Sequence, residues 1–294
     1  MKAALLSDRS VVEVSGPASA TFLDGLVTVA TAAMAPDRAR FGALLSPQGK
    51  ILFDFFIAGD GAGGFLLDTP RPLAAGLAAR LKFYRLRAKV EIADRSGDFA
   101  VVAAWDGAPA AGATFFPDPR LAGLGHRAIV PAEEASRILA ATEAAEPAAY
   151  EAHRIGLGVP AGGQDFAYGD AFPHEADMDQ LGGIDFGKGC YVGQEVVSRM
   201  QHRGTARTRI VPVSIAGPAP APATPVTAGE KAAGRMGSHA GSRGLAMLRL
   251  DRVAEAMAAG LPLVAGEATL TLTKPAWARF PWPGEAPSTA GAAE

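Results

Sequence analysis

The pattern of apolar residues changes near Thr208, and this change constrains the fold more than any other feature of the chain. Before it, strand-like apolar runs such as Ile51 to Ala58 alternate with longer segments of helical pattern such as Pro70 to Leu81. After it, the residues predict short strands and no long helix. The sequence therefore predicts an α+β body over residues 1–205 and a small all-β domain over residues 206–280.

Three segments give sharper local expectations. Ser15 to Val27 predicts a helix, with Pro17 near its first turn. Tyr84 to Val90 alternates basic with mostly apolar residues, which predicts a strand with one cationic face. Residues 281–294 form a low-complexity segment without core-forming residues, which predicts a disordered tail.

The composition narrows the class of protein. The chain has 294 residues, is 49% hydrophobic and carries a formal net charge of -2, so no global field attracts nucleic acid or a membrane. No apolar run approaches the roughly 18 residues that a bilayer-spanning helix needs. The run from Ala3 to Leu6 is too short for a signal peptide. We therefore expect a cytoplasmic protein with neither a membrane nor a nucleic-acid partner.

Cys190 is the only cysteine of the chain, and its neighbours are unusual. A single thiol excludes an internal disulfide, and it argues against a metal or cluster site built by one chain, so no metal site is predicted. Gly189 and Gly193 free the backbone around it, and the ammonium of Lys188 favours the thiolate. Cys190 and Lys188 thus form a candidate catalytic pair with an exposed, reactive thiol. The alternative is a small buried hydrophobe.

The run from Leu181 to Arg199, followed by His202-Arg203-Gly204, resembles the signature of the YgfZ family. These are folate-binding proteins related to the T-protein (aminomethyltransferase) of the glycine cleavage system, and their mitochondrial relatives serve iron–sulfur cluster maturation. The resemblance runs from about residue 10 to about 275. It implies a T-protein-like fold, a three-part ring in which residues 1–205 form two interleaved subdomains and residues 206–280 form a β-barrel. Other matching segments are Phe22–Thr28, Leu44–Asp54, Arg154–Pro160 and Pro173–Gln180.

The resemblance also implies a folate site. Asp54 matches a T-protein aspartate that lies close to the reactive nitrogens of tetrahydrofolate, whereas Phe53 replaces a second aspartate beside it. The alternative places Asp54 on the solvent face of an edge strand. Glu175 matches the glutamate that holds the pteridine ring, and its two oxygens suit that role. The alternative for Glu175 is an ordinary carboxylate in a surface loop.

Two groups of basic residues could bind either a nucleic acid or a smaller anion. They are Arg85, Arg87 and Lys89, and Arg199, Arg203, Arg207 and Arg209. No RNA-binding signature accompanies them, and most such runs are solvated. Because His202-Arg203-Gly204 belongs to the signature, Arg203 is the preferred arginine for the anionic glutamate tail of folate. The five histidines are scattered and show no metal-ligand spacing.

Three functions compete on these residues. The first is a folate-dependent accessory protein for assembly or repair of iron–sulfur clusters, with tetrahydrofolate, assembly proteins and client cluster enzymes as partners. The second is a folate-dependent aminomethyltransferase or demethylating transferase of the T-protein type, and the replacement of one aspartate by Phe53 argues against it. The third is a cysteine-nucleophile enzyme, which lacks a local hydrolase signature. The first fits best, and aminomethyltransferase activity is not expected.

Overall fold

The computed structural model describes residues 1–32, 34, 38–109, 114–204 and 206–285. The chain forms two compact units that interleave along the sequence. The first unit comprises residues 1–153, 168–173 and 181–199, and the second comprises residues 154–167, 174–180 and the chain from residue 200 onward. No described helix is long and apolar enough to cross a membrane.

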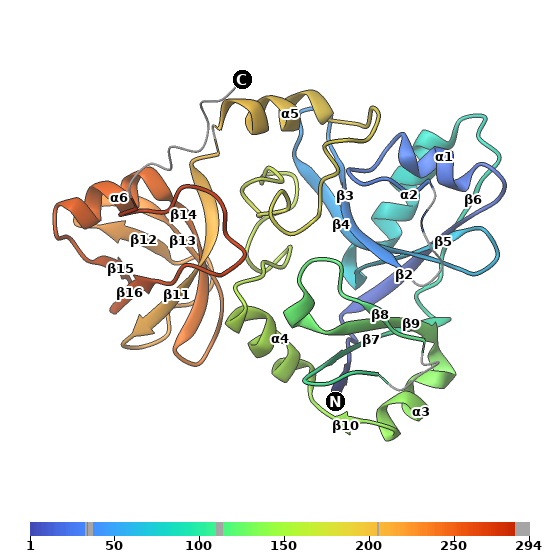
Figure 1. The fold of residues 1–294 in the computed structure, drawn as a ribbon, viewed down its shortest axis with the longest axis horizontal. Coiled ribbons are helices and arrows are strands. Elements are labelled where there is room, and N and C mark those ends of the chain that lie inside the picture. The colour runs from blue at the N-terminus through green and yellow to red at the C-terminus, as the bar shows by residue number, and fades with distance from the viewer. Residues whose placement is uncertain (33, 35–37, 110–113, 205, 286–294) are drawn as a thin grey trace. The chain divides into compact units, whose positions relative to one another are not determined.

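A five-stranded antiparallel sheet organises the first unit (Figure 1). Along β4, side chains alternate between the two faces, so Phe53, Phe55 and Ile57 pack toward α2 while Asp54 and Phe56 face the other side. The strands in spatial order are β3 (Ala39–Leu45), β4 (Ile51–Gly59), β5 (Phe65–Pro70), β2 (Arg9–Ser15) and β6 (Glu91–Asp94). The helices on the α2 side are α1 (Ser19–Asp24), the 3₁₀ turn η1 (Arg71–Leu73) and α2 (Ala74–Arg85).

A second five-stranded sheet packs against the opposite face of the first. Leu6, Leu66, Val101 and Trp105 contribute to the core between the two sheets. The strands in spatial order are β10 (Glu143–Ala144), β1 (Lys2–Leu5), β7 (Phe99–Trp105), β9 (His126–Pro131) and β8 (Phe116–Pro117). The short helices that accompany this sheet are η2 (Ala122–Leu124), η3 (Ala132–Glu134) and α3 (Ala135–Ala140).

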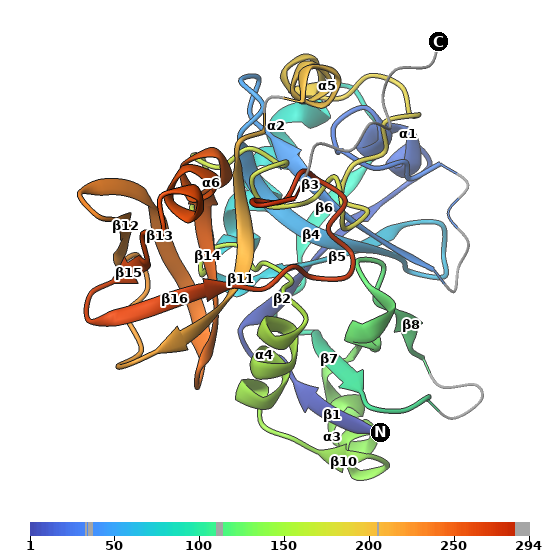
Figure 2. The ribbon, with the colours of Figure 1, turned by 60° about the vertical axis from the view of Figure 1, so that its left-hand side comes forward.

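The second unit contains a closed six-stranded barrel with one helix, α6 (Leu250–Ala258), beside β13 and β14 (Figure 2). The expectation of no long helix after Thr208 missed α6. Its apolar residues Leu250, Val253 and Ala256 follow β14 without a breaker, so the strand pattern runs on into the helix. The barrel strands in order are β11 (Thr208–Ala216), β14 (Arg243–Arg249), β13 (Lys231–Ala240), β12 (Pro225–Ala228), β15 (Leu263–Ala265) and β16 (Ala268–Leu272).

Several local predictions differ from the structure. The helix expected over Ser15 to Val27 is shorter, because Gly16 adopts a φ of +101° before it and Gly25 follows α1. The strand expected over Tyr84 to Val90 is wrong: α2 continues to Arg85, and a turn follows. Trp282 packs against the barrel core, while residues 286–294 of the expected tail lie outside the described residues.

The two remaining helices that the structure describes are α4 (Pro147–Gly156) and α5 (Gln194–Arg203), and α5 lies within the signature run. Arg154, at the end of α4, is buried and anchors the barrel through Asp165. Its Nη1 donates to Asp165 Oδ2 at 2.9 Å, and Nη2 donates to Ser238 Oγ at 3.1 Å. Ser238 of β13 donates its backbone N–H and its hydroxyl to Asp165 Oδ1, both at 2.7 Å. A single carboxylate therefore holds an arginine and a barrel strand together.

Replacing Asp165 with alanine should destabilise the protein strongly. The change removes the buried carboxylate that pairs with the Arg154 guanidinium at 2.9 Å, and loss of one partner of a buried ion pair costs about 3–5 kcal/mol. Urea unfolding of Asp165→Ala against wild type measures this cost. Glu267→Ala, at an exposed carboxylate of the barrel, is the control and should leave the midpoint unchanged. Equal midpoints for both variants would contradict the assignment.

Candidate functional site

Asp54 is buried in a central strand, with only 7% of its surface exposed. Since β4 lies between β3 and β5, the solvent-face alternative of an edge strand is wrong. The Tyr168 hydroxyl donates to Asp54 Oδ1 at 2.5 Å. Burial, with the negative charge of Asp54 beside it, raises the pKa of Tyr168, so the phenol stays protonated and acts as the donor. The carboxylate is thus fixed in orientation inside the protein.

Phe56, two residues along the same face of β4, lies beneath three arginines. The guanidinium carbons of Arg127, Arg120 and Arg9 lie 4.0, 4.7 and 5.7 Å from the centre of its ring. Phe41 of β3 extends this aromatic floor, with its ring centre 5.3 Å from that of Phe56. Guanidinium groups favour aromatic faces in this way. We call Arg9, Arg120, Arg127 and Phe56 the arginine cluster.

Two buried aspartates balance the arginine cluster. Asp68 accepts from Arg9 Nε at 2.6 Å and from Arg127 Nη2 at 2.7 Å. Asp118 accepts from Arg120 Nε and Nη2 at 3.0 and 2.8 Å. Burial raises the pKa of Asp118, but the adjacent Arg120 outweighs it and the net shift of that pKa is downward, so the carboxylate is ionised.

The cluster makes this face of β4 a polar, arginine-rich environment. None of its members was a candidate from the sequence, and neither was Tyr168. Asp68 in the apolar run Phe65 to Asp68 was the available signal, because a charge in a buried strand requires a partner. Phe53 offers no polar group to this face, since it packs on the other side of the sheet beside Gly76.

Cys190 is exposed, in agreement with the predicted accessible thiol. It lies in an irregular segment four residues before α5. Lys188, however, directs its ammonium toward the end of α1: Nζ donates to Asp24 O at 2.6 Å and to Val27 O at 2.7 Å. Desolvation lowers the pKa of Lys188, against the opposing charge of Asp24. Its described hydrogen bonds therefore position the segment by satisfying carbonyls at a helix C-terminus.

Buried contacts on either side hold the segment that carries Cys190. The Thr28 hydroxyl donates to Gly183 O at 2.6 Å and accepts from Ala43 N at 2.9 Å, which joins the segment to β3. Gly193 has a φ of +83°, and a Cβ there would lie 2.6 Å from Ser46 O in the β3–β4 turn. Gly193 is thus required for close packing, whereas a Cβ on Gly189 would have no neighbour within 4 Å.

Glu175 and Arg203 belong to the second unit, whereas Asp54, Lys188 and Cys190 belong to the first. Glu175 is half-buried, and its carbonyl accepts from Ile210 N at 3.2 Å, which fixes its backbone beside β11. Arg203 is exposed at the last residue of α5.

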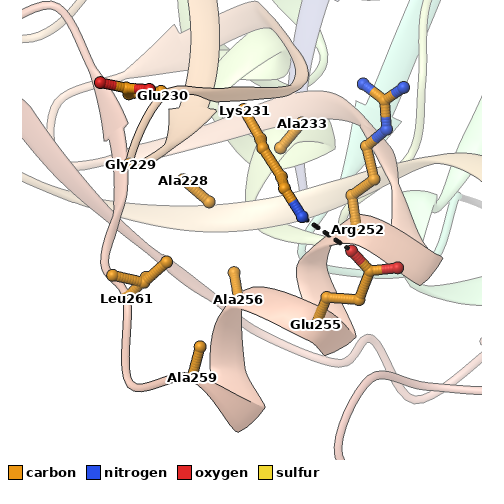
Figure 3. A pocket seen from close by; sticks show the side chains of 10 residues that line it. All are labelled: Ala228, Gly229, Glu230, Lys231, Ala233, Arg252, Glu255, Ala256, Ala259 and Leu261. Carbon is orange, nitrogen blue, oxygen red and sulfur yellow. Dashed lines mark ion pairs between the residues drawn. The ribbon is translucent and has the colours of Figure 1, made fainter.

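A pocket of about 290 Å³ in the second unit contains none of the predicted site residues (Figure 3). Alanines such as Ala228 and Ala256 form its floor, and the ion pair of Lys231 with Glu255, 3.6 Å apart, lies at its rim. Its lining offers no buried charged group to orient a polar ligand.

Gly193→Ala should destabilise the first unit, and Gly189→Ala should not. The first change places a Cβ against the carbonyl of Ser46 in a backbone conformation that alanine resists, at a cost of about 2 kcal/mol or more. The second places it in open space. Thermal unfolding of both variants gives the comparison. If both glycines serve only to expose the thiol, the two unfolding temperatures will not differ.

Comparisons with known proteins agree with this architecture. The family model for the CAF17 C-terminal β-barrel domain matches residues 207–280. The crystal structure of the glycine cleavage system aminomethyltransferase T from Bartonella henselae superposes with a TM-score of 0.75, covering 96% of this chain and 87% of that one at 15% sequence identity. The T-protein-like fold with a C-terminal barrel, predicted from the sequence resemblance, is therefore confirmed.

Sequence relatives point to one family. The chain is 36% identical to the mitochondrial iron–sulfur cluster assembly factor IBA57 homolog of Mycosarcoma maydis, covering 86% of this chain and 74% of that protein. It is 31% identical to the human mitochondrial iron–sulfur cluster assembly factor IBA57, covering 84% and 77%. A further homolog, from Pyricularia oryzae, is longer, and the chain spans 56% of it at 37% identity.

The names of these relatives contradict the predicted cytoplasmic location, because all three are called mitochondrial. The prediction rested on the lack of a secretory signal and of a membrane-spanning run, and neither feature distinguishes the cytoplasm from mitochondria. A lone thiol does not distinguish them either, because a reducing environment is not confined to one compartment. The likeness itself extends over most of this chain and most of the first two relatives. The chain belongs to the family of the IBA57 iron–sulfur cluster assembly factors.

Proposed function

We propose that this protein is an accessory factor for the assembly or repair of iron–sulfur clusters in client enzymes, and that it uses a reduced folate and the thiol of Cys190. Membership in the IBA57 family supports the role in cluster assembly. The observation that carries the finer proposal is an exposed thiol on a segment that buried contacts anchor to α1 and β3. Such a segment presents sulfur to a partner at a defined place.

The polar groups at Asp54 fit a reduced folate. A buried, oriented carboxylate accepts hydrogen bonds from the N–H groups of a reduced pterin, and Tyr168 holds it in place. The resemblance to the T-protein implies that Glu175 holds the pteridine ring, and Arg203 is the preferred arginine for the glutamate tail because it belongs to the signature. Bound tetrahydrofolate would supply one-carbon or redox chemistry. Aminomethyl transfer is not part of the proposal, since Phe53 replaces an aspartate and faces the core.

In this proposal, the exposed thiol of Cys190 is the group that contacts a partner. A thiolate is a good ligand and nucleophile, and it can hold a sulfur species, an iron atom or a partner's cysteine. Lys188 serves this role as a positioning residue, because its ammonium holds the preceding segment against α1. Tyr191 lies next to the thiol in sequence and is buried, with its ring centre 5.2 Å from Lys188 Nζ. Together these contacts fix one side of the cysteine while leaving its side chain exposed.

Tetrahydrofolate should bind the wild type, and Asp54→Asn should bind it clearly more weakly. Loss of one charge-assisted hydrogen bond costs about 1.5–3 kcal/mol, or roughly tenfold or more in Kd. Calorimetric titration measures the affinity. Glu175→Ala should weaken binding similarly, and Tyr168→Phe should do so by releasing the carboxylate. Glu267→Ala is the matched control and should bind as the wild type does.

Failure of the wild type to bind at millimolar tetrahydrofolate would remove folate from the proposal. It would leave the role of the thiol intact, because the thiol is tested separately.

Cys190→Ser should keep the fold and lose the function. The side chain is exposed and forms no disulfide, so thermal unfolding should be unchanged. Alkylation of the native wild-type thiol should be fast without denaturant, because the side chain is exposed. In cells without the native gene, the variant should fail to restore the activity of a cluster-dependent enzyme, whereas Ser198→Ala on α5 should restore it. Full restoration by Cys190→Ser would show that the thiol is dispensable.

A further inference from the structure

The end of α2 exposes two large apolar side chains. Phe83 is 72% exposed and Leu86 is 87% exposed, the highest values among the large apolar residues that the structure describes. They lie three residues apart, one in the last turn of α2 and one directly after it. Single exposed apolar residues are common on protein surfaces, so these two indicate a binding surface only if the residues around them do as well.

Those surroundings are strongly basic. Five exposed cations lie within ten residues, and no acidic residue occurs from Arg71 to Val90, although the whole chain carries a net charge of -2. None of the five forms an ion pair with a residue in the described ranges, so their charge is available to a partner. We call Phe83, Leu86 and these cations the α2-turn surface. The cations are Arg80, Lys82, Arg85, Arg87 and Lys89.

The backbone at Leu86 is strained. Its φ of 45° and ψ of -108°, with a hydrogen bond from Ala88 N to Arg85 O at 2.8 Å, describe a turn of the II′ kind, where this position favours glycine. The chain beyond the turn is fixed, because Lys89 O accepts from Ala18 N at 3.3 Å. A leucine here costs stability and packs against no core, so the fold itself does not explain it.

We propose that the α2-turn surface binds the face of a bilayer that contains anionic phospholipid. Lysine and arginine near such a face are attracted to its headgroups, and phenylalanine and leucine enter the boundary between headgroups and acyl chains. A hollow of about 530 Å³ adjoins the turn, and its charged lining residues are Arg85, Arg87 and Lys89 with one acid, Glu91, so cations outnumber acids there. The contact is peripheral.

A bilayer fits this surface better than an acidic protein. A stable protein interface buries about 1,200 Å² or more around an apolar centre. Two exposed apolar side chains among exposed cations do not form such a centre. A lipid surface needs no complementary shape, and it binds long cationic side chains and a few apolar anchors at the same time. The small net charge of the whole chain does not oppose this, since attraction to a membrane depends on the local charge within a Debye length.

Co-sedimentation of the full chain with vesicles tests the proposal. The protein should bind vesicles of phosphatidylcholine with about 30% phosphatidylglycerol and should not bind vesicles of phosphatidylcholine alone. Raising the salt from about 0.1 M to about 0.5 M should weaken the binding by screening.

Variants separate the contributions of charge and apolar anchors. Arg85→Gln with Arg87→Gln should lower the vesicle partition coefficient by about fivefold for each charge removed. Phe83→Ser with Leu86→Ser should lower it by about tenfold or more. The matched control, Met257→Ser with Leu261→Ser, removes two other exposed apolar side chains and should change nothing.

Leu86→Gly gives the sharpest test, because it should raise the unfolding temperature by relieving the turn while it weakens vesicle binding. Absence of wild-type binding to the anionic vesicles would overturn the proposal. So would equal binding by the anchor variant and its control. If the same variants leave vesicles unaffected but weaken binding to an acidic peptide such as poly-glutamate, the surface belongs to a protein partner and the proposal is wrong.

Discussion

The carboxylate of Asp68 lies where the two sheets of the first unit meet. It is fully buried, and each of its oxygens accepts from a different arginine: Arg9 of β2 and Arg127 of β9. One aspartate therefore links the two sheets across their shared core. Loss of Asp68 would take the nearest counter-charge from both arginines, Arg127 among them fully inside that core, at a cost of about 3–5 kcal/mol. The aromatic floor of Phe56, and with it the surroundings of Asp54, depends on those arginines staying in place.

The region around Cys190 is arranged differently: the cysteine is exposed, and its neighbours in the sequence are held by hydrogen bonds and close packing. Lys188 was predicted to activate the thiol, but its ammonium satisfies two carbonyls at the end of α1. The glycines around the cysteine also differ in purpose, because Gly193 packs against a turn while Gly189 borders open space. Lys188 and Gly193 thus fix the position of the segment that carries Cys190.

The sequence predicted much of the fold and less of the site. Alternation and helical spacing located β4 and α4, and the resemblance to the T-protein supplied an arrangement of sheets that periodicity cannot give. Tyr168 was missed because a tyrosine in a loop carries no sign of the carboxylate it contacts 114 residues away. The error at Tyr84 to Val90 has a local cause: alternation of basic and apolar residues fits both a strand and the exposed end of a helix. Asp54 was identified because the resemblance matched it to a T-protein aspartate, and its place within the apolar run from Ile51 to Ile57 agrees with a charge that needs a partner.

The interleaving of the two units has a consequence for how the chain folds during synthesis. Arg154 and Asp165 leave the ribosome well before Ser238, the barrel residue that completes their network. Until β13 is made, the ends of α4 and its following loop lack the surface that buries them, so their charges stay hydrated. Domains usually fold in the order in which they are translated. Here the first unit can close around its own segments, while the second must wait with early segments held open until its C-terminal strands arrive.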